Sequence, residues 1–164
     1  MSDNAALIQQ SFVQNNSIPK TMQLRREAAQ LFRNGRIIAL WHRFWGHITQ
    51  HDVSLKNLND LKSTTPLQIR QQAGIQEIPI NQIKGSVGRS RDFDHLFRPL
   101  KTHNKDRWVN VAVARRMGVP LPAVNLIQIG DRFFVRDGHH RISVARSMGQ
   151  ATIDASVIVW KTVK

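Results

Sequence analysis

The sequence contains no cysteine, and it has no long apolar run. Without cysteine the chain can form no disulfide, no thiolate metal site and no cysteine nucleophile. No segment approaches the roughly 20 apolar residues that span a bilayer, and residues 1–16 lack the basic start and apolar run of a secretory signal. These absences predict a protein without a membrane span and with a cytoplasmic location.

Acidic residues are also few, with 11 Asp and Glu against 24 Lys and Arg and a net charge of +13. The excess is spread along the chain, because residues 1–75 carry nine basic against four acidic side chains and residues 76–164 carry fifteen against seven. A surface of this charge attracts polyanions, of which nucleic acid is the commonest. We therefore expect DNA or RNA as a partner, although acidic lipid or a phosphorylated small substrate would be attracted by the same charge.

Length and composition fit a small globular domain with a helical appendage. The chain has 164 residues, of which 41% are hydrophobic and 21% charged, a globular rather than a disordered composition. We expect a flexible leader at residues 1–18, a basic helical segment with a linker at 19–75, and the main domain at 76–164.

Two helices are predicted in the basic segment. The first begins near Pro19 and ends at Asn34-Gly35, and the second runs from Arg36 to about His51. Trp and Arg on such a helix suit a membrane surface or nucleic acid, but an aromatic stripe is more often core, so we expect packing against the main domain. His47 and His51 are one turn apart without a further ligand, and no metal is expected there. The apolar stripe of the second helix consists of Ile37, Leu40, Trp41, Phe44, Trp45 and Ile48.

The main domain alternates apolar, β-prone segments with helical ones. Strands are predicted at residues 77–80, 123–129, 133–136 and 153–159, with a hairpin turn at Gly130-Asp131. Helices are predicted at residues 92–97 and 106–117, and a further helix follows residue 138. This order predicts an α+β fold, a small mixed sheet with packed helices that is preceded by an N-terminal helical segment.

The motif Asp137-Gly138-His139-His140-Arg141 stands at a predicted strand-to-helix junction. Behind it, apolar residues recur at helical spacing, and Gly149 stands where a C-terminal cap is expected. The first turn of a helix has unpaired backbone N–H groups and the positive end of the helix dipole. A phosphate or carboxylate is therefore favoured at this junction.

The motif, with Ala145, Gly149 and the final strand, resembles the ParB/sulfiredoxin superfamily over roughly residues 77–159. ParB proteins have Gly-x-Arg-Arg at this junction, sulfiredoxins have Gly-Gly-Cys-His-Arg, and free-serine kinases of the superfamily have Asp-Gly-His-His-Arg. The resemblance implies a small mixed sheet with helices around it and a nucleotide pocket at the motif. Sulfiredoxin chemistry is excluded, because the family's cysteine falls on His139.

A second candidate anion loop precedes residue 90. Its glycines would let the backbone approach a ligand and Arg89 could neutralise phosphate charge, but the loop lacks Walker spacing, so ligand contact and a simple turn both fit. The loop resembles the ParB segment that helps to line the nucleotide pocket. The candidate cofactor-binding residues are Gly85, Ser86, Gly88, Arg89, Gly138, His139 and Arg141.

Asp137 and His140 are the candidate catalytic residues. Asp137 suits a helix N-cap, a Mg²⁺ ligand or a general base, and the resemblance to the serine kinases favours the latter two. Two adjacent His side chains diverge, so we expect His140, next to Arg141, to serve the phosphate. Asp92 and Asp94 suit either a second acid for Mg²⁺ or substrate, or a plain helix N-terminus.

Three functions follow from these residues. The first is a nucleotide- or phosphate-binding domain associated with nucleic acid, whose cofactor is a nucleoside triphosphate or diphosphate, with or without Mg²⁺. The second is a small-molecule phosphotransferase resembling the free-serine kinases, and the third is a basic adaptor that binds the nucleic-acid backbone without nucleotide. If the protein is an enzyme, it is an NTP- or ADP-dependent phosphotransferase or a nucleotide hydrolase.

Overall fold

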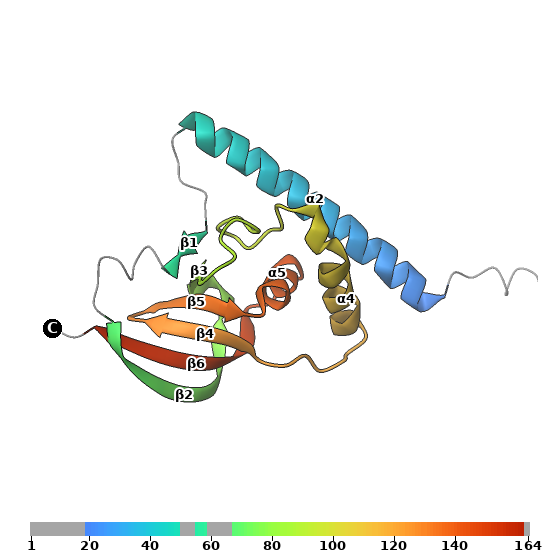
Figure 1. Ribbon diagram of the computed structural model, residues 1–164. Coiled ribbons are helices and arrows are strands. Elements are labelled where there is room, and N and C mark those ends of the chain that lie inside the picture. The colour runs from blue at the N-terminus through green and yellow to red at the C-terminus, as the bar shows by residue number, and fades with distance from the viewer. Residues whose placement is uncertain (1–18, 50–54, 59–66, 163–164) are drawn as a thin grey trace, which may run out of the picture.

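The computed structural model describes residues 19–49, 55–58 and 67–162 (Figure 1). The leader expected at residues 1–18 lies outside these residues. The helices are α2 (Lys20–Thr49), α4 (Lys105–Arg116) and α5 (His139–Ser147), with short 3₁₀ turns at Ile80–Gln82 and Thr102–Asn104. The strands are β1 (Lys56–Asn57), β2 (Leu67–Pro79), β3 (Ile83–Ser86), β4 (Val124–Ile129), β5 (Arg132–Asp137) and β6 (Thr152–Thr162).

The strands form one mixed sheet in the order β1-β3-β5-β4-β6-β2. Strands β1, β3 and β5 are parallel to one another, β4 and β6 are parallel, and the β5–β4 and β6–β2 pairs are antiparallel. Strands β4 and β5 form the predicted hairpin, where Gly130 has a φ of 60°. The α+β class, a mixed sheet with packed helices and a preceding helical segment, is confirmed.

Strand β2 is longer than the sequence pattern suggested. It pairs with β6 from Leu67 opposite Thr162 to Pro79 opposite Thr152, so the sheet takes in residues that the sequence analysis placed in the linker. The missed part includes Gln71, Gln72 and Gln76, which give no apolar alternation. An edge strand can carry such polar residues, since only one of its sides joins the sheet.

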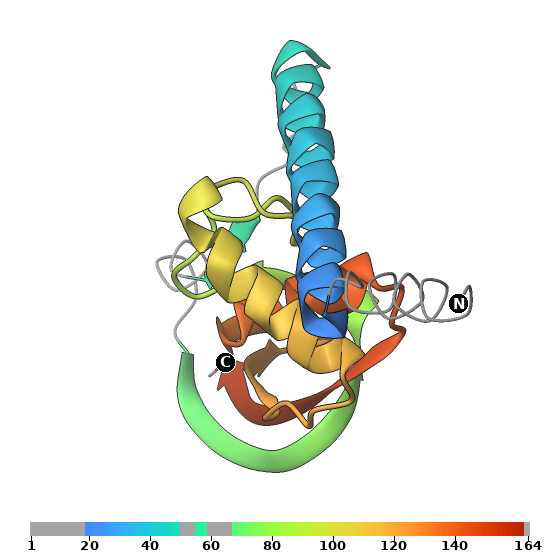
Figure 2. The ribbon, with the colours of Figure 1, turned by 90° about the vertical axis from the view of Figure 1, so that its right-hand side faces the viewer.

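Helix α5 lies beside the sheet, α4 packs on α5, and α2 crosses over α4 (Figures 1 and 2). The first half of α2 packs on α4 through Ala28 and Phe32, and the Phe32 ring meets the buried Trp108 ring edge-on at a centroid distance of 5.7 Å. Trp108 Nε1 in turn donates to Ser143 Oγ of α5 at 2.8 Å. The three helices therefore share one apolar cluster above the sheet.

Helix α2 is continuous, so the prediction of two helices separated at Asn34-Gly35 is wrong. Glycine weakens a helix without ending it, and here tertiary contacts outweigh its low propensity. A Cβ at Gly35 would lie 3.8 Å from Pro99 Cδ, and Arg36 Nε donates to the Leu100 carbonyl oxygen at 3.1 Å. The 99–100 segment thus supports the helix at its weakest point.

Because Gly35 is helical and an added methyl group would find ordinary contact, we expect Gly35→Ala to stabilise the protein by roughly 0.5–1 kcal/mol. Urea denaturation measures the change. Gly118→Ala is the control, since Gly118 has a φ of 72° and alanine there should be destabilising. A loss of stability from Gly35→Ala would mean that the helix bends at this residue.

The predicted helix at residues 92–97 is also wrong, because this segment forms turns and an isolated bridge between Phe93 and Pro99. Asp94 is buried, and its Oδ1 accepts hydrogen bonds from the backbone N–H groups of Leu96 at 3.0 Å and Arg98 at 2.8 Å. An aspartate side chain that takes up backbone donors in this way competes with the helix.

The apolar stripe in the second half of α2 does not pack against the main domain, contrary to the expectation. Its members are 40–60% exposed, whereas the buried residues of α2 are Ala28, Phe32, Ala39 and Gly46. Ala28 and Phe32 face α4, and the exposed apolar stripe lies on the other side of the helix. Among the described residues, no helix is both long and apolar enough to cross a membrane.

Candidate functional site

The motif lies at the junction of β5 and α5, as predicted. Gly138 is the N-cap of α5 with φ 95° and ψ 20°, a left-handed conformation that glycine adopts without strain. A Cβ at this position would lie 2.6 Å from Val124 Cγ1. No side chain caps α5, and the first N–H groups of a helix lack intrahelical partners. The junction therefore presents backbone donors and the positive end of a helix dipole.

Asp137 ends β5 and is not the N-cap, which is Gly138. Its carboxylate is 61% exposed and accepts a hydrogen bond from Arg141 Nη2 at 2.8 Å. Arg141 Nη1 also donates to the carbonyl oxygens of Ala123, at 2.9 Å, and Pro122. The guanidinium group of Arg141 is thus occupied by protein acceptors and fastens α5 to the segment before β4.

Ser86 and His139 form a buried hydrogen bond, with 2.7 Å between Oγ and Nε2. Ser86 Oγ also accepts from the backbone N–H groups of Gly88 at 3.3 Å and Arg89 at 3.0 Å. Since two donors occupy the lone pairs of this oxygen, the hydroxyl proton points to His139 Nε2, and the neutral imidazole carries its proton on Nδ1. Burial, followed by the charges of Arg89 and His140, lowers the pKa of His139 to about 4.

Gly85 lies inside β3, where the Phe134 ring fills the place of a side chain. A Cβ on Gly85 would be 2.5 Å from Phe134 Cδ1 and 2.6 Å from the Lys56 carbonyl oxygen. The next residues turn around Ser86, which takes up the backbone N–H groups of Gly88 and Arg89. In the predicted anion loop, the side chain of Arg89 remains accessible to a ligand. It is 44% exposed, and its Nη1 lies 3.8 Å from Asp92 Oδ2.

His140 is buried at 6% exposure, and neither ring nitrogen has a hydrogen-bond partner. Its ring meets Phe93 at 5.5 Å in an edge arrangement. Burial, followed by the charges of Arg107 and Arg89, lowers the pKa of His140 to about 4, although the charge of Asp92 acts to raise it. His140 is therefore a neutral, unpaired imidazole between cations.

Several residues of this site were not singled out from the sequence. Phe93 stacks on His139 with ring centroids 6.0 Å apart, and the charge of His103 also opposes protonation of His140. Asp92, which the sequence already suggested as a second acid, acts electrostatically on both imidazoles; burial acts to raise its pKa, but the hydrogen bond and charge of Lys101 lower it overall. Phe93 and His103 lie in the irregular segment 92–103, which has no periodic pattern to mark them.

His140 and Arg141 do not converge on one cavity. Arg141 lines a polar cavity of about 280 Å³, whose lining includes Glu77, Arg115 and Asp154 but not His140. The expectation that the two side chains point into one anion site is wrong, because adjacent residues at a helix start diverge. Within the described residues, no cluster of three His, Asp or Glu side chains is arranged to hold a metal ion.

No protein-family model matches the sequence, and no curated protein matches it either. Among solved structures, the crystal structure of sulfiredoxin from Arabidopsis thaliana is similar over 53% of this chain and 86% of that one, with 16% sequence identity and a TM-score of 0.42.

Proposed function

We propose that the protein binds the phosphate groups of a nucleotide at the N-terminus of α5. The unpaired His140 carries this proposal. Its two ring nitrogens are buried without partners, and a buried polar group without a hydrogen bond costs about 1–3 kcal/mol. A phosphate oxygen beside His140 would accept a hydrogen bond from its N–H nitrogen and remove that nitrogen's share of the cost.

The charges around His140 favour an anion over a neutral ligand. Arg107 and Arg89 both act on the imidazole from outside α5, one from α4 and one from the loop after β3. Both guanidinium groups belong to exposed residues and could move onto a ligand. An oxyanion between them would also meet the backbone N–H groups at the start of α5, a common arrangement for phosphate.

Isothermal titration with pyrophosphate, ADP, ATP, CTP and GTP, with and without Mg²⁺, tests the proposal. We expect saturable binding that weakens by about tenfold or more in Arg89→Gln and in Arg107→Gln, since each removes a charged donor. His140→Leu should also weaken binding. Arg136→Gln is the matched control, because Arg136 is an exposed arginine on β5 and its loss changes the net charge equally.

The comparison of mononucleotides with oligonucleotides separates a nucleotide site from a nucleic-acid site. Binding of a single-stranded oligonucleotide but not of ATP, lost in Arg89→Gln and Arg107→Gln, would identify the phosphate source as nucleic acid. Absence of binding to every phosphate compound, or equal affinities in Arg107→Gln and Arg136→Gln, would overturn the proposal. Incubation with ATP and hydroxyl amino acids then shows whether a phosphorylated product forms.

A further inference from the structure

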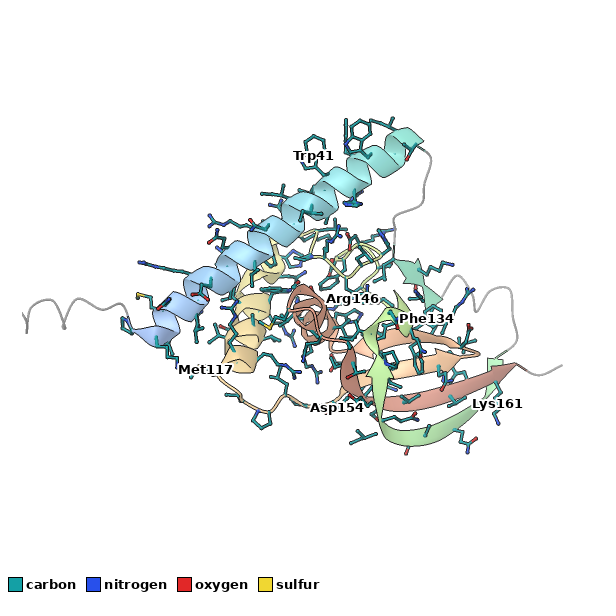
Figure 3. All side chains as sticks on the ribbon, turned by 180° about the vertical axis from the view of Figure 1, so that it is seen from behind. Trp41, Met117, Phe134, Arg146, Asp154 and Lys161 are labelled. Carbon is teal, nitrogen blue, oxygen red and sulfur yellow. The ribbon has the colours of Figure 1, made fainter. Side chains whose placement is uncertain are left out.

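The second half of α2 carries an exposed apolar surface, which we call the outer face. Its large side chains are between 40% and 60% exposed, and Figure 3 shows Trp41 pointing away from the domain. At 3.6 residues per turn these positions lie opposite the buried Ala39 and Gly46. The outer face consists of Ile37, Leu40, Trp41, Phe44, Trp45 and Ile48, whereas Ile38, at its margin, lines a cavity with Pro79 and Ile80.

The aromatic residues of the outer face form a continuous group. Phe44 lies between the two tryptophans, with ring centroids 6.5 Å from Trp41 and 6.2 Å from Trp45 in edge arrangements. Scattered exposed apolar residues are common on soluble proteins, but a contiguous group of this kind marks an interaction surface. The outer face is therefore a binding surface rather than incidental exposure.

Only positive charge borders the outer face on α2. From Arg33 to Thr49 the helix has three arginines, two histidines and no Asp or Glu. By helical spacing, Arg36, Arg43 and His47 follow one edge of the outer face, and His42 follows the other. A partner must therefore accept apolar side chains in the middle and supply negative charge along the margins.

We propose that the outer face of α2 binds the surface of an anionic lipid bilayer. A helix with Trp, Phe and aliphatic residues on one face and Arg at its margins lies in the plane of the headgroups, with its apolar side chains entering the acyl boundary. The C-terminal end of α2 projects beyond the sheet (Figure 2). The described part of the domain lies on the opposite side of the helix from Trp41 (Figure 3), so it would not obstruct a flat surface there.

Two other partners would match either the apolar residues or the positive charges of the outer face, but not both. A second copy of the chain would cover the apolar residues, but it would bring Arg33, Arg36 and Arg43 of both copies together without an acidic residue on this part of either helix. Nucleic acid would pair with the arginines and stack on the indoles, but it would leave Ile37 and Leu40 against a hydrated backbone. Anionic lipid supplies both the charge and the apolar medium.

Flotation of the full chain with vesicles tests this proposal. We expect binding to phosphatidylcholine vesicles that contain phosphatidylglycerol, weaker binding to pure phosphatidylcholine, and a decline as salt increases. The double variant W41S/F44S should lose about tenfold or more in affinity. Arg33→Gln combined with Arg43→Gln should weaken binding and reduce its salt dependence.

Ile75→Ser is the matched control, since Ile75 is a 74% exposed apolar residue on β2, and it should bind vesicles like the parent chain. Brominated lipid should quench the fluorescence of the parent protein, because Trp41 and Trp45 are exposed whereas Trp108 and Trp160 are buried. Absence of flotation with any vesicle would overturn the proposal, as would equal flotation of W41S/F44S. A dimer in sedimentation analysis that W41S/F44S abolishes would assign the outer face to a second copy instead.

Discussion

Substitution of Gly138 by valine is expected to lower the free energy of unfolding by about 4 kcal/mol or more. The residue has a φ of 95°, which a β-branched side chain adopts only with strain. In addition, a Cβ would lie 2.6 Å from Val124 Cγ1 and 2.9 Å from Val124 Cβ, in the interior. Since single domains are usually stable by about 5–15 kcal/mol, the variant should be largely unfolded at modest urea concentrations.

Two further variants separate backbone strain from steric overlap. Gly149 also has a positive φ, 71°, but a Cβ there would meet nothing within 4 Å, so Gly149→Ala measures the strain alone. Gly138→Ala adds the contact with Val124 and should cost more than Gly149→Ala. Equal losses in these two variants would mean that the start of α5 shifts to admit a side chain. Urea denaturation followed by circular dichroism gives all three values.

The local structure around Gly138 could be predicted because short-range physics determines it. A β-prone run, a glycine and a helical pattern that ends before Gly149 indicate a strand, a tight turn and a capped helix, and the structure has all three. The β4–β5 hairpin at Gly130 follows from the same kind of signal. In each case the residues that determine the element lie within a few positions of it.

The parts that could not be predicted depend on residues far apart in the sequence. The local sequence at Gly35 predicts a helix end, and only the contacts of Pro99 and Leu100 explain why α2 continues. The apolar stripe of α2 has the pattern of a core-facing stripe, and nothing nearby in the sequence reveals that Ala39 and Gly46 are the buried residues of this half instead. A spacing of small residues along α2 was the available signal, but it is weaker than the aromatic stripe.

In the candidate site, too, the sequence indicated residue types but not the contacts that those residues make with distant segments. The sequence predicted His140 and Arg141 as anion ligands because both residue types can bind phosphate. It could not reveal that the carbonyl oxygens of Pro122 and Ala123 already occupy Arg141, or that Arg107 lies near His140 instead. Residue type predicts what a side chain can do, whereas the fold decides whether its donors are free.

Acidification is expected to destabilise the protein through His139 and His140. In the folded protein both imidazoles have a pKa of about 4, against about 6.5 in the unfolded chain. Between these two pKa values the unfolded chain binds more protons than the folded protein. The free energy of unfolding therefore decreases as the pH falls from about 6.5 to about 4, and the full contribution of the two imidazoles is present above this window. We expect a loss on the order of 2–3 kcal/mol per imidazole.

Urea denaturation at a series of pH values, in chloride without other anions, measures this loss. His140→Leu should remove about half of the decline, because one titrating group is gone. Asp92 contributes only at the acid end of the window, since its pKa is lowered from 3.8 and most of its stabilisation is lost at lower pH. Stability that stays constant through the window would mean that water reaches both imidazoles in the folded protein.

The same titration in sulfate tests whether the pH dependence arises at the proposed anion site. Sulfate keeps its charge throughout this window, and an anion bound beside His140 favours the protonated imidazole and raises its pKa. Sulfate should therefore stabilise the protein more as the pH falls, and the decline of the parent chain should become shallower. In His140→Leu the sulfate effect should lose its pH dependence. If sulfate flattened the decline equally in both proteins, the anion would bind elsewhere, and His140 would be an unpaired core residue.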